Sequence, residues 1–173
     1  MRTCNGVTVS PKIFPLLKRF ELDIVSTIYI KSNLPDWTVG FAEETISLDW
    51  EERQKSRSRK TTDQGTEFGL SLATGSILNS DSIFILEQEK KLVRVMELEE
   101  SVYTVKPNTA EEMAFIAHQI GNRHQPLMIG HFELICQAIP AVRLLFNQLE
   151  VDYSEEKRAF SPASDRLGLS HSH

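Results

Sequence analysis

Histidine is absent from the first two thirds of the sequence, and this absence limits where a metal-binding function could reside. The 173 residues include five histidines, and all of them lie between His118 and the end of the chain. Imidazole is the side chain that most often binds nickel, zinc or copper. We therefore expect any transition-metal chemistry of this chain to depend on its C-terminal third.

Cysteines and long apolar runs are also scarce. The two cysteines, Cys4 and Cys136, are far apart and form neither a disulfide framework nor a CxxC site, which fits a reducing compartment. The chain lacks an apolar run of about eighteen residues, the minimum for a membrane-spanning helix. Lys12, Lys18 and Arg19 interrupt the apolar positions near the N-terminus, so we expect no signal peptide and predict a soluble, cytoplasmic protein.

An excess of positive charge is missing as well. Lys and Arg number 19 against 24 Asp and Glu, which gives a net charge of -5. Phosphate binding needs a positive surface, so nucleic acid is not expected as the main partner. The composition, 40% hydrophobic and 25% charged, is that of a globular protein with one large or two small domains.

Residues 21–98 have the pattern of an antiparallel β domain. We expect strands in the stretches 24–30, 45–50, 68–72, 83–86 and 92–96. Turn signals separate them, such as Asp63-Gln64-Gly65, whose glycine suits a positive φ in a hairpin. Residues 1–20 contain two prolines and little periodicity, so we expect a poorly ordered extension there.

A basic run follows the second of these strands. Arg53, Lys55, Arg57 and Arg59 occur at every second residue, and on a strand they would project from one face. One interpretation is a solvated strand that discourages edge pairing. Another is a docking surface for an acidic protein partner, with Arg53, Arg57 and Arg59 as contact residues.

Residues 99–160 are predicted to form a ferredoxin-like domain with the order βαββαβ. Thr109 and Glu112 form a capping box that opens a first helix, and Gly121 is its expected C-terminal stop. The buried stripe of this helix consists of Met113, Ile116, Ala117 and Ile120.

A second helix is predicted to begin at Pro140, a residue that suits the first helical turn. Its buried stripe consists of Val142, Leu145, Phe146 and Leu149. Strands are expected at 102–105, 127–129, 132–136 and 151–153. Residues 161–173 have no apolar periodicity and are predicted to be a flexible tail. The fold class is thus α+β, with an N-terminal antiparallel β domain, a ferredoxin-like domain and a C-terminal tail.

His124 is the strongest candidate metal ligand, because its backbone is expected to be fixed between a helix and a strand. One imidazole cannot hold an ion alone, but a two-fold dimer contact places the same residue of both chains face to face. His171 and His173 form an H-x-H arm that could complete the site, although a short polar tail is an alternative. His118 and His131 are more simply explained as surface, packing or turn residues.

Several segments resemble the urease accessory nickel metallochaperones, the urease accessory protein E family. The most specific is Ile120-Gly121-Asn122-Arg123-His124. Further similar segments are Thr109-Ala110-Glu111-Glu112, Phe160-Ser161-Pro162, and Leu48-Asp49-Trp50-Glu51-Glu52-Arg53 leading into Arg57 and Arg59. The resemblance covers about residues 45–173.

The resemblance implies a β-sandwich-like domain for protein contacts and a ferredoxin-like domain that binds metal and forms a homodimer. It places Ni²⁺ between two copies of His124 and maps terminal histidines of the family loosely onto His171 and His173. The implied partners are the urease accessory GTPase and apo-urease. Some members carry a second internal histidine pair where this chain has residues 136–140, so delivery of one ion per dimer is expected rather than storage of many.

We therefore expect a non-enzymatic nickel metallochaperone for urease maturation, with Zn²⁺ and Cu²⁺ competing for the same ligands. The alternative is a protein-interaction module that uses the basic strand and no metal. An enzyme ranks third, because Cys136 and His131 have no evident group to orient the histidine. RNA binding by the ferredoxin-like sheet is not expected, because its strands lack paired aromatic residues for stacking.

Overall fold

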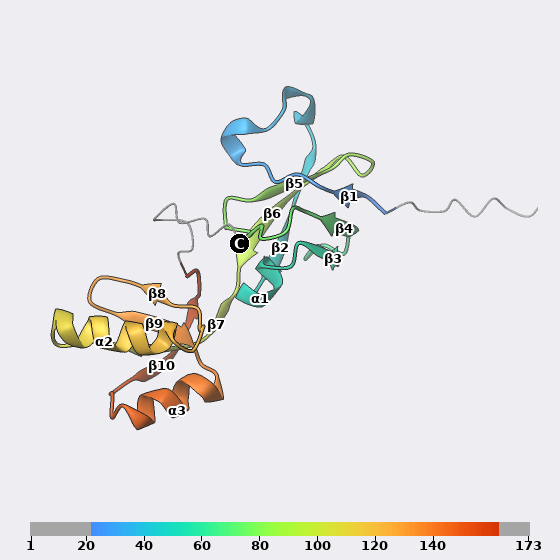
Figure 1. The fold of residues 1–173 in the computed structure, drawn as a ribbon. Coiled ribbons are helices and arrows are strands. Elements are labelled where there is room, and N and C mark those ends of the chain that lie inside the picture. Colours follow the sequence, from blue (N-terminus) through green and yellow to red (C-terminus); the bar gives the residue numbers. More distant parts are fainter. Residues whose placement is uncertain (1–21, 163–173) are drawn as a thin grey trace, which may run out of the picture.

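The computed structural model describes residues 22–162, and Figure 1 shows them as two parts. The upper part consists mainly of strands, whereas the lower part also carries two longer helices. The parts meet where β6 (Lys91–Glu97) continues into β7 (Glu99–Val105). Only Leu98 lies between these strands, and its amide donates to the carbonyl of Leu48 at 3.0 Å.

Two three-stranded sheets form the upper part. In spatial order they are β1 (Ile24–Val25), β4 (Glu67–Ser71) and β3 (Arg57–Thr61), and β2 (Ala42–Leu48), β6 and β5 (Ile83–Leu86). Their inward side chains form one apolar core, which consists of Val25, Ile46, Leu48, Phe68, Leu70, Leu72, Leu78, Phe84, Leu86, Val93 and Val95. The result is a two-layer β structure, as expected when each sheet has an apolar face to bury.

Two strand pairs in this part are parallel, which the sequence pattern does not reveal. β1 runs parallel to β4, with Ile24 opposite Gly69, and β2 runs parallel to β6, with Ala42 opposite Lys91. Apolar alternation identifies the buried face of a strand but does not specify its neighbour. The predicted hairpins are present, and β3 pairs antiparallel with β4 around Gly65, whose φ is +95°.

The chain between β1 and β2 forms a covering loop. The prediction of a strand over 24–30 is wrong beyond Val25, because only Tyr29 returns to the sheet, through an isolated bridge to Ile83. Two short 3-10 helices follow, η1 (Lys31–Asn33) and η2 (Asp36–Thr38). Partly buried apolar side chains of the loop cover the outer face of β5, and this explains why all four β5 residues are buried.

The basic run does not begin on a strand. Trp50–Arg53 forms the short helix α1, and the side chain of its N-cap residue Asp49 accepts a hydrogen bond from the amide of Glu52 at 2.8 Å. Arg53 is fully buried rather than exposed beside Arg57. The expectation that Arg53 projects from one strand face beside Arg57 and Arg59 is therefore wrong, because Arg53 lies on α1 and its guanidinium is enclosed by the protein.

The lower part is a four-stranded sheet with two helices, α2 (Ala110–Gly121) and α3 (Pro140–Gln148). The strands lie in the order β10 (Ser154–Ala159), β7, β9 (Leu134–Gln137) and β8 (Met128–Ile129), and all pairs are antiparallel. The core under the helices consists of Tyr103, Val105, Ile116, Ile120, Leu134, Cys136, Val142, Leu145 and Phe146. The predicted βαββαβ order, and with it the α+β class, is confirmed.

The last strand lies later than predicted. The stretch 151–153 is not a strand, although Val151 and Tyr153 do pack against the core. The strand itself, β10, is an edge strand with four exposed residues at its start. Its polar sequence carries no apolar alternation, so periodicity could not identify it.

Candidate metal and partner sites

His124 lies after helix α2 in a backbone conformation that fixes its position. Its φ is +54°, in the left-handed region. Its amide donates to the carbonyl of Gly121 at 2.8 Å, and the amide of Gln125 donates to the carbonyl of Ile120 at 3.4 Å. These two bonds form a Schellman motif, whose left-handed residue is usually glycine. Histidine at this position costs about 1–2 kcal/mol of backbone strain.

Gly121 ends the helix as predicted, but it is not the left-handed residue of the turn. It is the last residue of α2 and does not have a positive φ, and a Cβ atom added there would meet nothing within 4 Å. Helix α2 therefore ends at Gly121 as predicted, and the left-handed residue of the turn follows three residues later, at His124. The Schellman bond reaches back to Ile120, the last fully buried residue of the helix.

The surroundings of His124 favour a bound cation. Its side chain is exposed, and it lies beyond the C-terminal end of α2, where the helix dipole contributes partial negative charge. The preceding Arg123 donates to the carbonyl of Gln119 at 3.2 Å and to the side chain of Gln148 at 3.4 Å. The second contact connects the turn to helix α3.

The other histidines do not join His124 in a cluster. His118 lies 3.0 Å from the side-chain nitrogen of Asn122, and His131 packs edge-on against Phe132 in the turn between β8 and β9. Among residues 22–162, no group of three or more His, Cys, Asp or Glu side chains is placed to hold an ion. His171 and His173 lie outside the described residues.

The topology brings the start of the C-terminal residues to the same end of the sheet as His124. β10 ends at Ala159, opposite Glu99, the first residue of β7. Helix α2 leads back along the sheet from the end of β7 to the start of β8, which runs in the same direction as β7 (Figure 1). His124 and residues 160–162 therefore lie at the end of the sheet where β7 begins.

The basic strand β3 carries little unpaired charge. Arg57 and Arg59 are both exposed, as predicted for one face of a strand, and Arg59 forms an ion pair with Glu67 at 2.6 Å. Lys55 and Lys60 both pair with Glu52, and these hydrogen bonds lower the pKa of the Glu52 carboxyl. Within the described part of the chain, Arg57 is the basic residue of this run without an acidic partner.

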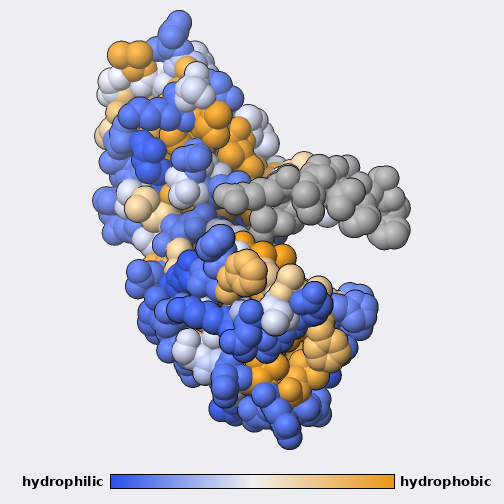
Figure 2. Space-filling model, turned by 90° about the vertical axis from the view of Figure 1, so that its left-hand side faces the viewer, coloured by the Kyte–Doolittle hydropathy of each residue, from blue (hydrophilic) through white to orange (hydrophobic). Residues whose placement is uncertain are grey.

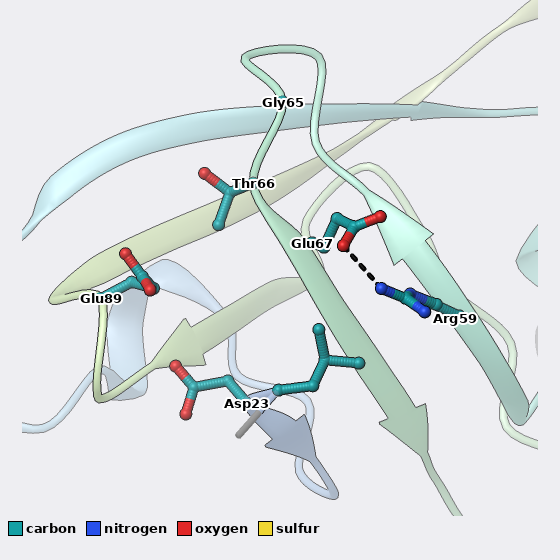
Figure 3. A pocket seen from close by; sticks show the side chains of 7 residues that line it. Asp23, Arg59, Gly65, Thr66, Glu67 and Glu89 are labelled. Carbon is teal, nitrogen blue, oxygen red and sulfur yellow. Dashed lines mark hydrogen bonds and ion pairs between the residues drawn. The ribbon is translucent and has the colours of Figure 1, made fainter. Parts of the chain in front are cut away.

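A hollow of about 550 Å³ lies beside β3 and β4 (Figure 3). Asp23, Glu67 and Glu89 contribute carboxylates to it, and Arg59 lies on its rim, paired with Glu67. Its lining contains neither imidazole nor thiol, the ligands that soft or borderline metals prefer. The hollow therefore does not compete with His124 as a nickel site.

Cys136 is not placed to act as a nucleophile. It is fully buried in the core beneath the helices, and burial raises the pKa of its thiol to about 12. The thiolate is the reactive form of cysteine, and it is scarce at neutral pH when the pKa is so high. The pairing of Cys136 with His131 as catalytic groups thus receives no support from the geometry.

Large apolar side chains remain exposed on the lower part. Phe115, Ile129, Phe132 and Leu144 are each more than half exposed. Figure 2 shows apolar side chains reaching the surface of this part among polar ones. Exposed apolar patches of this kind often mark contacts with another protein. No helix among residues 22–162 is long and apolar enough to cross a bilayer.

One cluster at the junction of the two parts could not be identified from apolar periodicity. Trp50 and Phe160 pack edge to face with ring centroids 6.0 Å apart, and Arg53 lies over the Trp50 ring at 5.3 Å. Asp49 and Glu52, three residues apart, are a helix-start signal that could have revealed α1. No local signal connects them to Phe160.

The two parts of the chain match two family models. Residues 30–96 match the N-terminal domain of the UreE urease accessory protein, and residues 100–173 match its C-terminal domain. The urease accessory protein UreE of Staphylococcus saprophyticus is 32% identical over 140 residues, which cover 81% of this chain and 93% of that protein. The corresponding protein of Halalkalibacterium halodurans is 29% identical over 144 residues, covering 83% and 93%, and that of Lysinibacillus sphaericus is 33% identical over 128 residues, covering 74% and 86%.

Proposed function

The chain belongs to the UreE family of urease accessory proteins, and we propose that its task in urease maturation is to bind Ni²⁺ and deliver it. Nickel is the cargo, and the protein itself is not an enzyme. We place the cargo site at His124. The observation that carries this proposal is the Schellman turn, which holds an exposed imidazole in one backbone conformation at a helix C-terminus.

A homodimer supplies the second ligand. Within the described residues His124 belongs to no group of three or more His, Cys, Asp or Glu side chains that could hold an ion, so these residues of one chain offer too few ligands there. A two-fold contact between two copies of the C-terminal domain places His124 of each chain beside the same ion. The exposed Phe115, Ile129 and Phe132 provide apolar surface that a dimer could bury.

The C-terminal histidines complete the ligand shell. His171 and His173 follow Ser161 by ten and twelve residues in the sequence. An extended chain spans about 3.3 Å per residue, so these histidines are within reach of the end of the sheet where His124 lies. Zn²⁺ and Cu²⁺ compete for the same imidazoles, and a ligand shell drawn partly from a chain terminus exchanges its ion more easily than a closed site.

Delivery requires protein partners as well as a metal site. We propose that the protein works in the cytoplasm with the urease accessory GTPase and apo-urease, and that the N-terminal β domain contributes to these contacts. The family membership supports this proposal.

The test is a calorimetric nickel titration of the wild-type protein and of His124→Ala, with the mass of the assembly measured in parallel. About one tight Ni²⁺ per dimer is expected for the wild type, and loss of that site is expected for the variant. His118→Ala and His131→Ala are matched controls, because both remove an exposed imidazole of the same domain. Tight nickel binding that persists in His124→Ala would overturn the placement.

A further inference from the structure

Helix α1 forms a second connection between the two domains, besides the chain itself. The chain passes from the β domain to the ferredoxin-like domain through Leu98, between β6 and β7. Domains joined in this way usually move relative to each other unless a large, apolar interface holds them. Helix α1 follows β2 in the β domain, but its Trp50 and Arg53 both contact the ferredoxin-like side of the junction. The contacts of these two residues therefore decide whether the domains can turn about Leu98.

Trp50 makes the apolar part of this connection. It is buried in one cluster with Val102 of β7, Ile135 of β9 and Phe160, and its ring lies edge to face with that of Phe160. The residues next to these on β7 and β9 belong to the core under the helices, so Trp50 covers the opposite face of the sheet. The amide of Trp50 also donates to the carboxylate of Glu100 at 2.9 Å. A residue of the β domain thus helps to bury the ferredoxin-like sheet.

Arg53 makes the polar part of the connection. It is fully buried, and its guanidinium donates to the carbonyl of Leu78 at 3.3 Å and to the carboxylate of Glu97 at 3.0 Å, both in the β domain. It also donates to the carbonyl of Phe160 and, at 3.0 Å, to the hydroxyl of Ser161, two residues that directly follow β10. The Ser161 hydroxyl in turn donates to Glu97 at 2.8 Å. One side chain thus bonds to both sides of the junction.

The two parts of the connection restrict motion in different ways. Apolar burial is non-directional, so the packing of Trp50 alone would allow one surface to slide on the other. A guanidinium presents its N–H groups in a fixed plane, and its burial is costly when they lose their partners. A turn about Leu98 would carry Phe160 and Ser161 away from Arg53 and break the bonds that match its buried charge. Arg53 therefore opposes the motion that the single-residue joint would otherwise permit.

We propose that Trp50 and Arg53 form an interdomain lock, which holds the β domain and the ferredoxin-like domain in one relative orientation. The two domains then act as one rigid body, so a protein partner bound to the first meets the second in a single orientation. The lock does not depend on nickel binding at His124. Its failure in an experiment would leave the proposed function intact, and failure of the proposed function would leave the lock intact.

The test is a distance measurement between spin labels on the two domains, by pulsed electron paramagnetic resonance. The labels are attached through Thr61→Cys on β3 and Leu144→Cys on α3, two exposed positions, in full-length chains that all carry Cys4→Ser. Cys136 is buried and stays unlabelled. An excess of unlabelled protein limits the signal to distances within one chain. We expect one narrow distance distribution when the lock is intact, and a distribution at least about twofold wider for Arg53→Met, as for domains that move independently.

A second variant keeps the test independent of the folding of Arg53→Met. The double variant Phe160→Ala/Ser161→Ala removes the ring and the hydroxyl on the ferredoxin-like side, and it should also widen the distribution. Glu44→Gln is the matched control, because it removes a buried charge whose partners all belong to the β domain. It should lower stability and leave the distribution narrow. A wide distribution with the lock intact, a narrow one in the double variant, or equal widening by Glu44→Gln would overturn the proposal.

Discussion

The interiors of the two parts of the molecule differ in how many polar side chains they bury. In the described residues, the buried polar side chains of the β domain are Thr38, Glu44, Arg53, Lys60, Thr62 and Ser82, whereas the ferredoxin-like domain buries only Thr104. The interior of the β domain, which contains parallel strand pairs, is thus partly polar, whereas that of the ferredoxin-like domain is almost entirely apolar.

Glu44 illustrates how the β domain uses buried polar groups. Its carboxylate pairs with Lys91 at 2.6 Å and accepts hydrogen bonds from Thr62 and Thr66. Burial raises the pKa of Glu44, but these bonds outweigh burial and leave the pKa below its ordinary value of 4.5. The contacts connect β2 and β6 to the turn between β3 and β4, and so join the two sheets.

The largest expected effect is in the apolar core of the ferredoxin-like domain. Phe146 is fully buried, and Phe146→Ala removes its packing against Tyr103 and Tyr153. We expect the free energy of unfolding in urea to fall by about 3–5 kcal/mol. Leu144→Ala, on the exposed side of the same helix, should change it by less than about 0.5 kcal/mol. Similar losses for the two variants would mean that this core is not the stabilising one.

A smaller loss is expected from the polar interior of the β domain. Glu44→Gln removes the charge that Lys91 pairs with, and the free energy of unfolding should fall by about 1–3 kcal/mol at pH 7. The folded pKa of Glu44 is lowered, so its contribution is present above pH 4.5 and disappears as the pH falls through the lower folded value.

Urea unfolding at several pH values tests this sign. The difference between wild type and Glu44→Gln should shrink as the solution becomes more acidic than pH 4.5. Glu43→Gln is the control, since the Glu43 carboxylate is largely exposed and its distance to Arg94, 3.5 Å, is longer than that between Glu44 and Lys91. If the difference in stability between wild type and Glu44→Gln grew in acid, the lowered pKa of Glu44 would be contradicted.

The next effect separates strain from metal binding in the ferredoxin-like domain. Helix α3 also ends in a Schellman motif, with Glu150 at φ +53°, so His124 and Glu150 occupy equivalent positions. His124→Gly and Glu150→Gly should each raise the free energy of unfolding by about 1 kcal/mol. Only His124→Gly should lose tight nickel binding in calorimetry. Loss of nickel binding in both would point to helix geometry rather than to the imidazole.

The smallest effect is expected on the exposed face of β3. Arg57→Gln should change the free energy of unfolding by less than about 0.5 kcal/mol, because Arg57 has no acidic partner in the described residues. Nickel affinity should be unchanged. Arg53→Gln, on the same short segment, should instead lower the free energy of unfolding, because it removes a buried charge. If Arg57→Gln abolished binding to the accessory GTPase, the basic strand would be the docking surface after all.

The sequence predicts those features whose determinants are local. Thr109 and Glu112 mark the start of α2 and Pro140 marks the start of α3. The stripes that follow them face the core as expected, with their residues either buried in it or partly buried against it. The left-handed turn at His124 escaped prediction because propensity assigns such turns to glycine, and Gly121 was nearby.

Features that depend on distant partners could not be predicted from the sequence. Arg53 follows the same alternation as Arg57 and Arg59, but its surroundings include Phe160, and no local pattern connects the two. The parallel pairing of β2 with β6 could not be predicted for the same reason, because β3, β4 and β5 separate the two strands in the sequence. For the candidate site, the sequence points to His124 as a candidate ligand but not to the conformation that holds it.

The single residue between β6 and β7 has a mechanical consequence. β6 is the middle strand of its sheet, and β7 lies inside the other sheet, so Leu98 joins two strands that each have neighbours on both sides. A protease finds no slack segment there to cut, and a force applied to one part passes directly into the other through the backbone. A partner that binds the β domain and moves it would therefore move the ferredoxin-like domain with it.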